Sequence, residues 1–291
     1  MEIRVLRYFV EIARCGSMSK AAESLHVSQS ALSKQMSELE AELGKKLFKR
    51  VSRGLLLTDE GMLLRKRAED ILEMVEKTED EFKELGELKG GDVRIACAES
   101  HLISHLAKAV ASFKEDYPLF RYHLYSGDSE IVLDKLDRGA VDFAIIVEQP
   151  DFSKYNYLEI PGEDVWGLLV KSDSDLAKKE KITAQDLVGL ELICSRQSIA
   201  NDIARWCPET VDSLNFSGTM NLNYNASIFV DEGLGCLLTL DKLSDTSEES
   251  GLSFIPLYPK LTSKLFLVWR KYQMFTPIAE RFLERLEQYL A

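Results

Sequence analysis

Polar and basic side chains able to contact DNA gather in the first 53 residues. Gln29 can pair with an adenine edge, Ser33 is permissive, and Lys34 can reach a guanine or a phosphate. Further contacts to bases, phosphates or the minor groove are expected from hydroxyl and basic residues nearby: Ser17, Ser28, Ser30, Lys49, Arg50 and Arg53. Residues of these types at this density predict a nucleic-acid contact surface.

Two short amphipathic helices would position these side chains. Apolar residues keep helical spacing in two runs: Ala21, Ala22 and Leu25, then Ala31, Leu32, Met36, Leu39 and Leu43. Ser17 or Ser19 can cap the first helix and Ser28 the second, because a hydroxyl accepts hydrogen bonds from unpaired first-turn N–H groups. Since only residues 25–27 separate the runs, a helix-turn-helix is expected, with its second helix in the major groove.

The flanking segments complete this unit. A preceding helix would pack beneath it through an apolar stripe of Val5, Leu6, Phe9, Val10 and Ala13. After Gly44, a left-handed C-cap, Leu47 and Phe48 can pack back on the helices while the basic residues stay in water. A turn at Arg53-Gly54 between two short strands then predicts a basic wing.

The stretch from residue 16 to residue 61 carries a dense motif. Its residues are Ser17, Ala21, Ala22, Leu25, Ser28, Gln29, Ala31, Ser33, Leu39, Glu40, Leu43, Gly44, Leu47, Phe48, Lys49, Arg50, Leu57, Thr58 and Gly61. This series is similar to the N-terminal module of LysR-type transcriptional regulators. The resemblance implies a regulator of transcription with no enzymatic activity and no cofactor, whose operator binding or activation responds to a small-molecule effector.

Charge is unevenly distributed along the 291 residues. The net charge is −12, but residues 1–58 carry +4 and the remainder −16. The basic residues 1–58 would bind DNA phosphates, while the acidic remainder of the chain would be repelled by them. No apolar run approaches the ~18 residues of a membrane span, and the start at Met1 reads as a helix rather than a signal peptide. A cytoplasmic protein without a membrane partner is therefore expected.

A long helix is predicted from Asp59 to about residue 88. Its apolar residues alternate spacings of four and three for about three heptads: Leu64, Ala68, Ile71, Val75, Thr78, Phe82 and Leu85. The helix could lie on its own body, but a two-helix coiled coil between subunits is favoured, and the resemblance agrees. A dimer would present two heads to an operator that is an interrupted inverted repeat. The resemblance also implies tetramers and contact with RNA polymerase.

Beyond the glycines at 90 and 91 the pattern changes to alternating strands and helices, which predicts parallel pairing. The expected strands are 93–98, 121–126, 143–147, 165–170, 190–194, 220–223, 236–238 and 264–269, and the expected helices 102–116, 130–138, 198–206, 226–232 and 277–290. The multidomain fold class is thus an all-α winged helix-turn-helix (1–58) with a linker helix (59–89), followed by an α/β two-lobed domain (90–291). Lobe I would comprise 91–161 and 270–291, and lobe II 162–269. This arrangement resembles the LysR effector domain, itself like periplasmic binding proteins.

Ligands of open α/β sheets bind beyond the carboxyl ends of the strands, where helices present free N–H groups. The candidate effector-binding residues at such places are Ser100, His101, Ser126, Ser129, Glu148, Ser195, Gln197, Ser198 and Asn225. Hydroxyls beside backbone amides suit a small carboxylate. In the family, positions matching Ser100, Ser129 and 195–198 commonly touch the effector. Glu99, His101 and Glu148 could instead recognise an amine or a hydroxyl, and this alternative stays open.

Other functional classes receive less support. His101 and His105 stand four apart near Glu99, but no third ligand or nucleophile accompanies them, so neither a metal site nor an enzyme is expected. The five cysteines show no metal-binding spacing. Cys194 and Cys207 are placed loosely like the pair of peroxide-sensing LysR relatives, which makes a redox-sensing regulator the alternative. A third alternative is a DNA-binding protein without a ligand.

Overall fold

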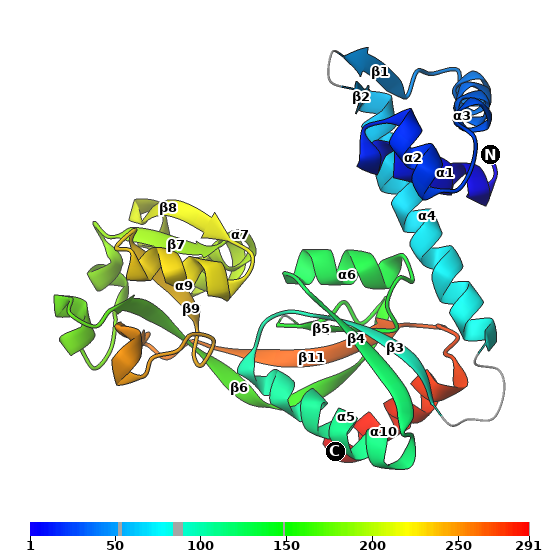
Figure 1. The fold of residues 1–291 in the computed structure, drawn as a ribbon. Helices are drawn as coiled ribbons and strands as arrows, with labels where there is room; N and C mark the ends of the chain where they lie inside the picture. The colour runs from blue at the N-terminus through cyan, green and yellow to red at the C-terminus, as the bar shows by residue number, and fades with distance from the viewer. Residues whose placement is uncertain (52–53, 84–89, 148, 291) are drawn as a thin grey trace. The chain divides into compact units, whose positions relative to one another are not determined.

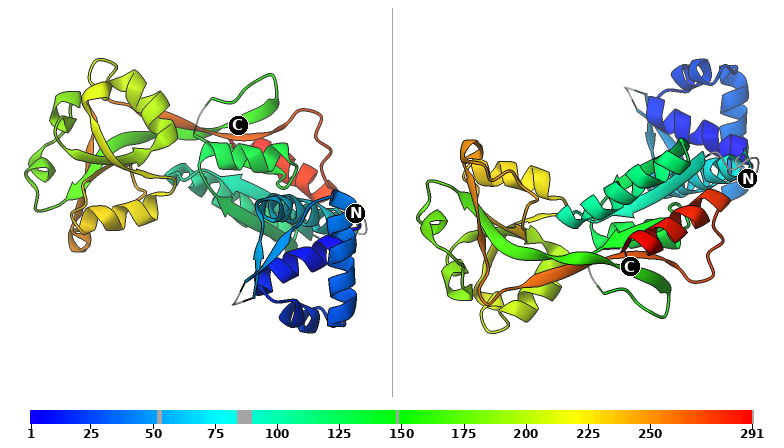
Figure 2. Two further views of the ribbon diagram at one scale, coloured as in Figure 1. Left: turned by 90° about the horizontal axis from the view of Figure 1, so that it is seen from above. Right: turned by 90° about the horizontal axis from the view of Figure 1, so that it is seen from below.

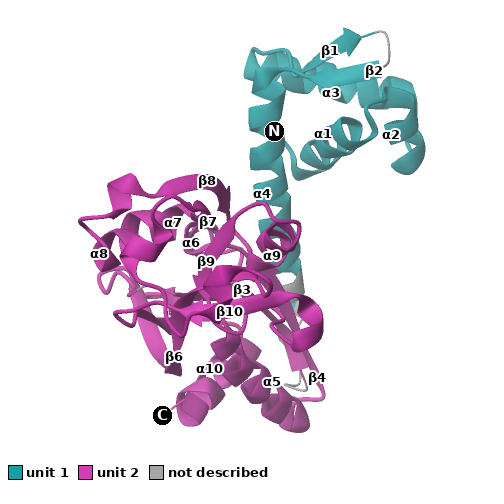
Figure 3. Ribbon diagram, turned by 90° about the vertical axis from the view of Figure 1, so that its left-hand side faces the viewer, with its two compact units in different colours: residues 1–83 teal, residues 84–291 magenta. Residues whose placement is uncertain are grey.

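The computed structural model describes residues 1–51, 54–83, 90–147 and 149–290. Three residues of the predicted sites, Arg53, Leu85 and Glu148, lie outside this described part. The chain divides into two compact units, Met1–Lys83 and Glu84–Ala291 (Figure 3). None of the described helices is long and apolar enough to cross a membrane.

The first unit is a winged helix-turn-helix followed by a long helix. Its described elements are α1 (Ile3–Cys15), α2 (Met18–Ser24), α3 (Gln29–Leu43), the antiparallel strands β1 (Phe48–Val51) and β2 (Gly54–Leu57), and α4 (Asp59–Lys83). The predicted caps are confirmed: Ser17 accepts a hydrogen bond from the Lys20 N–H, Ser28 accepts one from the Ala31 N–H, and Gly44 is left-handed at φ 64°. Helices α2 and α3 therefore begin, and α3 ends, where the local chemistry indicated.

The core of this unit is built from one stripe of each helix. Leu6, Phe9 and Ile12 of α1 pack with Leu32 and Leu39 of α3. Two expected core positions are wrong, because Ala31 and Leu43 of α3 are exposed. Helical spacing alone did not distinguish the buried stripe from its edges.

The wing is fixed by a close backbone approach. The Leu55 N–H donates to the Gly16 carbonyl oxygen at 2.8 Å. Gly54 has a φ of +131°, and a Cβ there would lie 2.5 Å from the same oxygen. A side chain at position 54 would therefore push the wing away from the end of α1.

Helix α4 only partly fits the predicted seam. Ala68 is fully buried in the core of its own head, and Leu64 and Ile71 pack partly against that core. The assignment of Ala68 to a contact between subunits is therefore wrong, since α1 of the same chain already covers it. Val75 is half-buried and Phe82 is 71% exposed.

The described residues of the second unit form a nine-stranded sheet with the order β4-β3-β5-β11-β6-β9-β7-β8, and β10 pairs with β6 (Figure 1). The strands are β3 (Gly90–Cys97), β4 (Leu119–Ser126), β5 (Phe143–Ile146), β6 (Tyr155–Lys171), β7 (Glu191–Ser195), β8 (Asn215–Met220), β9 (Cys236–Leu240), β10 (Leu252–Pro256) and β11 (Thr262–Arg270). The main helices are α5 (Ser104–Asp116), α6 (Ser129–Asp137), α9 (Asn223–Asp231) and α10 (Pro277–Leu290).

Lobe I consists of β3, β4 and β5 with the parts of β6 and β11 that pair beside them. The three strands are parallel, as predicted. Strands β3 and β5 are mostly buried, whereas β4 at the edge of the sheet is largely exposed. Helices α5 and α10 cover one face, where Phe113 and Phe282 meet at 5.2 Å between ring centroids (Figure 2). Helix α6 covers the other face through Val132 and Leu136.

Lobe II consists of β7, β8, β9 and β10 with the second half of β6. Between β7 and β8 the chain runs through α7 (Arg196–Ser198), a π-helical turn at Ile199–Ile203 and α8 (Ala204–Trp206). The strand predicted at 220–223 is wrong: β8 ends at Met220 and α9 begins at Asn223. Strand β10 and the first ten residues of β6 were not predicted.

Strands β6 and β11 join the two lobes. They pair antiparallel from Tyr155 to Val165, with a register shift between Ser263 and Leu265. Leu265 lies in the core of lobe I, together with the later inward residues of β11. The expected lobe boundary at 270 is therefore too late, and lobe I resumes at about the register shift.

Candidate functional site

The predicted base-reading residues lie exposed on the first turns of α3. Gln29, Ser33 and Lys34 are all solvent-accessible. Gln29 Oε1 accepts a hydrogen bond from the Ser19 hydroxyl at 3.2 Å, and Lys34 faces Glu38 at 3.8 Å. Both interactions are local and exposed, so each is weak enough to be exchanged for a ligand contact.

Two of the predicted hydroxyls have a structural role. Ser17 and Ser28 cap α2 and α3, and the Ser28 and Ser30 hydroxyls lie 3.2 Å apart. These residues hold the first turn of α3 in place. Any contact they make to a nucleic acid would come in addition to the cap.

A hollow of about 520 Å³ separates α3 from the wing. Gln29 and Ser33 line one side, and Lys46 and Arg50 line the other. Lys49 is exposed on the same strand as Arg50. Hydrogen-bonding groups thus face a basic wing across one groove, which is suited to a polyanion.

Glu40 fixes the wing to the recognition helix. Its Oε1 accepts from the Leu47 N–H at 2.9 Å and the Phe48 N–H at 3.4 Å, and its Oε2 pairs with Lys46 at 2.6 Å. Burial alone would raise the pKa of this carboxyl, but these contacts together lower it. The carboxylate therefore stays ionised and holds the start of β1.

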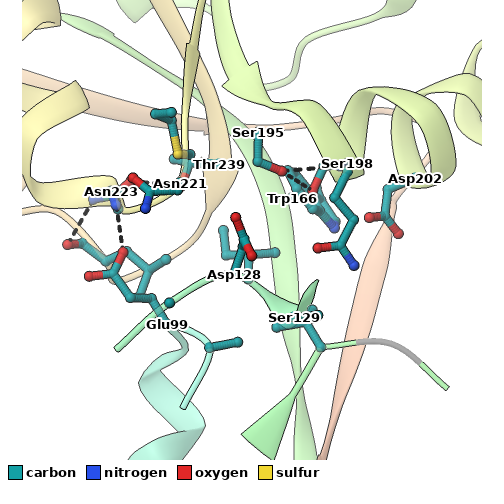
Figure 4. Close-up of a pocket in the computed structure, with 17 residues that line it drawn as sticks. Glu99, Asp128, Ser129, Trp166, Ser195, Ser198, Asp202, Asn221, Asn223 and Thr239 are labelled. Carbon is teal, nitrogen blue, oxygen red and sulfur yellow. Dashed lines mark hydrogen bonds between the residues drawn. The ribbon is translucent and has the colours of Figure 1, made fainter. Parts of the chain in front are cut away.

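The second unit contains a pocket between its two lobes (Figure 4). The cavity itself measures about 80 Å³, within a wider space that is open to solvent. Asp128 and Ser129 lie on one side, at the start of α6, and Ser195 and Ser198 lie on the opposite side, at the start of α7 (Figure 4). Trp166 of β6 also lines it. The site lies at the carboxyl ends of β3 and β7, as expected for open α/β sheets.

Only some of the predicted effector-binding residues line this pocket. Those that do are Ser129, Ser195, Gln197 and Ser198. Those that do not are Ser100, His101, Ser126 and Asn225. Ser126 and Asn225 are exposed elsewhere, and Ser100 is buried.

Ser100 and His101 instead tie the lobes together. The Ser100 hydroxyl donates to Asp164 Oδ2 at 2.7 Å and caps the following helical turn. His101 Nδ1 lies 2.7 Å from Asp164 Oδ1, and Lys242 Nζ lies 3.2 Å from His101 Nε2. Burial raises the pKa of Asp164, although Ser100 and His101 act in the opposite direction. The predicted effector role of these two residues is therefore replaced by a structural one.

Among the described residues, side chains of the types and spacing that could hold a metal ion are found in this same cluster. Ligand atoms of His101, Asp164 and Asp241 lie within 4.8 Å of one another. The Lys242 ammonium pairs with Asp241 at 3.5 Å and also reaches His101. Because this lysine already supplies positive charge, the cluster needs no metal for charge balance.

Several pocket residues were missed by sequence reasoning: Asp128, Trp166, Asp202, Asn221, Asn223 and Thr239. Asn223 is 2% exposed and fully engaged, since its side chain donates to the Leu243 carbonyl and accepts from Thr239. The Asn223 N–H donates to the Glu99 carboxylate, which bridges lobe I to the start of α9. The incorrect strand at 220–223 concealed this helix start.

The cysteines of the alternative redox hypothesis are buried. Cys194 is 0% exposed and Cys207 is 4% exposed, both in the core of lobe II. Burial raises the pKa of Cys194 to about 12 and raises that of Cys207. Thiols held neutral in an apolar core react poorly with peroxide.

Both units of the chain match known protein families. Residues 3–62 match the bacterial regulatory helix-turn-helix proteins of the lysR family, and residues 86–291 match the LysR substrate binding domain. The uncharacterized HTH-type transcriptional regulator YybE of Bacillus subtilis (strain 168) is 25% identical over 290 residues, 97% of each chain. The hydrogen peroxide-inducible genes activator of Pectobacterium carotovorum subsp. carotovorum is 26% identical over 276 residues, 93% of this chain and 90% of that protein.

The fold also matches that of CbnR, a LysR family transcriptional regulator, with a TM-score of 0.75 and 20% identity over the full length of both chains. A second structure of CbnR, in complex with its target DNA, also gives 0.75, at 21% identity over 99% of this chain and 100% of that one. The helix-turn-helix, the long α4 and the α/β substrate-binding unit are thus found together in one family of transcriptional regulators, not of enzymes. The chain belongs to the LysR family of DNA-binding transcriptional regulators.

Proposed function

We propose that a small molecule bound between the two lobes of the second unit controls operator binding by this LysR-family regulator. The observation that carries the proposal is a pocket lined from both lobes, with Asp128 and Ser129 on one side and Ser195 and Ser198 on the other. A ligand that contacts both sides prefers one disposition of the lobes and shifts the population toward it. That this ligand carries a carboxylate, as expected from the sequence, stays a prediction. The acidic residues that line the pocket argue against it.

On DNA, Gln29, Ser33 and Lys34 would contact bases or nearby phosphates, and Lys49 and Arg50 would contact the backbone or minor groove, joined by Arg53. Two observations support these DNA contacts. Gln29, Ser33, Lys34, Lys49 and Arg50 are exposed, and a groove lies between α3 and the wing. The exposed Phe82 and half-buried Val75 of α4 support dimerisation. A dimer would bind an interrupted inverted repeat, and assembly to tetramers and contact with RNA polymerase remain predictions.

The test uses the full chain and a DNA duplex selected from random sequence. Fluorescence anisotropy would measure its affinity with and without a panel of metabolites, and the melting temperature would report their binding. We expect at least one compound both to stabilise the protein and to change the affinity for the selected duplex. A panel that stabilises the protein without changing DNA affinity would contradict the proposed control.

A redox mechanism is the second candidate, because one relative is a hydrogen peroxide-inducible genes activator. The burial of Cys194 and Cys207 and their raised pKa values weigh against it. Peroxide treatment followed by mass spectrometry under native conditions would decide. Rapid formation of a disulfide between the two cysteines would favour redox sensing over a ligand.

A further inference from the structure

The pocket between the lobes is lined by negative charge. Its charged residues, within the described part of the chain, are Glu99, Asp128 and Asp202, and no lysine, arginine or histidine lines it. The nearest compensation is Arg205, which pairs with Asp202 at 3.3 Å, but its side chain is 72% exposed and lies outside the pocket lining. A ligand anion would therefore meet repulsion from three carboxylates.

The helix N-termini at the pocket are already occupied by the protein's own acceptors. Asp128 Oδ1 accepts from the Ile131 N–H at 3.0 Å at the start of α6. Glu99 accepts from the Asn223 N–H at the start of α9. A ligand carboxylate at either helix start would lie beside one of these carboxylates instead of in an open anion site.

The hydroxyl of a largely buried serine opens into the same pocket. Ser129 is 5% exposed and lines the pocket beside Asp128 (Figure 4). Over the ranges that the structure describes, its hydroxyl makes no hydrogen bond with another residue. Because Ser129 Oγ is not one of the fully buried atoms that lack a partner, it keeps access to the pocket and can contact a polar ligand group at the start of α6.

Apolar side chains also line the pocket and offer a surface for an apolar part of the ligand. Trp166, Met220, Leu240 and Leu243 line the pocket together with the acidic residues. Asp202 lies near Ser198, where burial raises its pKa although Arg205 and Ser198 act in the opposite direction. A ligand cation beside Asp202 would stabilise the ionised carboxylate, which burial disfavours.

We propose that the effector presents a protonated amine, or another cationic nitrogen, to Asp128, Asp202 and the Ser129 hydroxyl, with an apolar body against Trp166. This inference rests on the proposed function and names the chemical class of its ligand. It selects the amine alternative over the carboxylate that the serine-rich helix starts had indicated. Ammonium groups donate three hydrogen bonds, which matches a wall that offers acceptors.

The test compares probes of one shape and three charges. Benzylamine, benzyl alcohol and benzoate form an aromatic series, and 1,4-diaminobutane, 1,4-butanediol and succinate form an aliphatic one. Melting temperature and calorimetry would follow each probe with the full-length protein. We expect concentration-dependent stabilisation by an amine of either series, and none by the matching alcohol or carboxylate.

Substitutions of pocket residues test whether the probes bind in the pocket. Asp202→Asn and Asp128→Asn remove charge while they keep an acceptor, and each should weaken binding of the amine about tenfold, as for loss of one charge-assisted contact. Asp134→Asn is the matched control, because Asp134 lies on α6 outside the pocket and pairs with Arg138. Circular dichroism would confirm that each variant folds.

Each result separates the inference from the proposed function. Binding of a carboxylate probe that changes DNA affinity would overturn the amine inference and leave ligand control of DNA binding intact. Amine binding that the Asp134→Asn control weakens as much as Asp202→Asn would also overturn it. If no amine of either series binds, the inference fails, and a metabolite panel that also leaves DNA affinity unchanged would remove the proposed function as well.

Discussion

Replacing Gln29 with alanine tests whether the first turn of α3 reads bases. A bidentate contact from glutamine to adenine discriminates by about 1 to 3 kcal/mol. In the free protein, Gln29 Oε1 already accepts from Ser19 at 3.2 Å. Breaking that exposed hydrogen bond costs at most about 1 kcal/mol. For a contact at the upper end of that range, the expected net loss is therefore about 2 kcal/mol, or about thirtyfold in affinity for the selected duplex.

Anisotropy titrations on the selected duplex and on random DNA at one salt concentration would measure the loss. Gln29→Ala should weaken specific binding and leave non-specific binding nearly unchanged. Gln35→Ala is the matched control, since this glutamine of α3 lies outside the groove and donates to Glu38. Ser19→Ala should not weaken specific binding, because it only frees Gln29. Equal losses on both DNAs, or an equal effect of Gln35→Ala, would refute the assignment.

Three further outcomes are expected. Lys49→Ala should weaken binding to all DNA alike and reduce the slope of log affinity against log salt by about 0.9, as measured by titration at several salt concentrations. Phe82→Asp should raise the dimer dissociation constant in sedimentation, since each buried phenylalanine contributes about 1.5 to 3 kcal/mol, whereas the equally exposed Leu119→Asp on β4 should not. Asp186 accepts from Lys179 at 2.5 Å and from the Thr183 N–H and hydroxyl, and these contacts, that of Lys179 foremost, lower its pKa from 3.8 to about 2. Its contribution is therefore fully present above about pH 4 and is lost as the pH falls through about 2, so Asp186→Asn should cost about 1 kcal/mol at pH 7 and progressively less below pH 4. Tryptophan fluorescence would follow the denaturation, because all three tryptophans lie in the second unit.

The helix-turn-helix was predictable because its signals are local. Ser17, Ser28 and Gly44 act within a few residues of their own position, and the structure uses each as the cap that the sequence indicated. The parallel strands of lobe I were equally clear, since continuous apolar runs alternate there with helical ones. Strands β3 and β5 are buried because helices cover both faces of the sheet there, whereas the edge strand β4 stays largely exposed.

The lining of the pocket was less predictable, because it depends on contacts between distant segments. Glu99 and Asn223 are 124 residues apart, and their hydrogen bond links two lobes. Ser100 looked like a ligand contact by its position after β3, but Asp164 takes its hydroxyl. A hydroxyl at a helix start has the same local pattern whether it faces a ligand or another strand.

The sequence by itself determined the class of fold, the recognition helix and the family resemblance, because capping residues, apolar periodicity and charge are properties of neighbouring residues. The tertiary structure alone decided which face of each element is covered. It buried Ala68 beneath its own head and placed three carboxylates around one pocket. Burial and charge balance are set by whichever residues the fold brings together, so the chemistry of the ligand is a property of the folded chain.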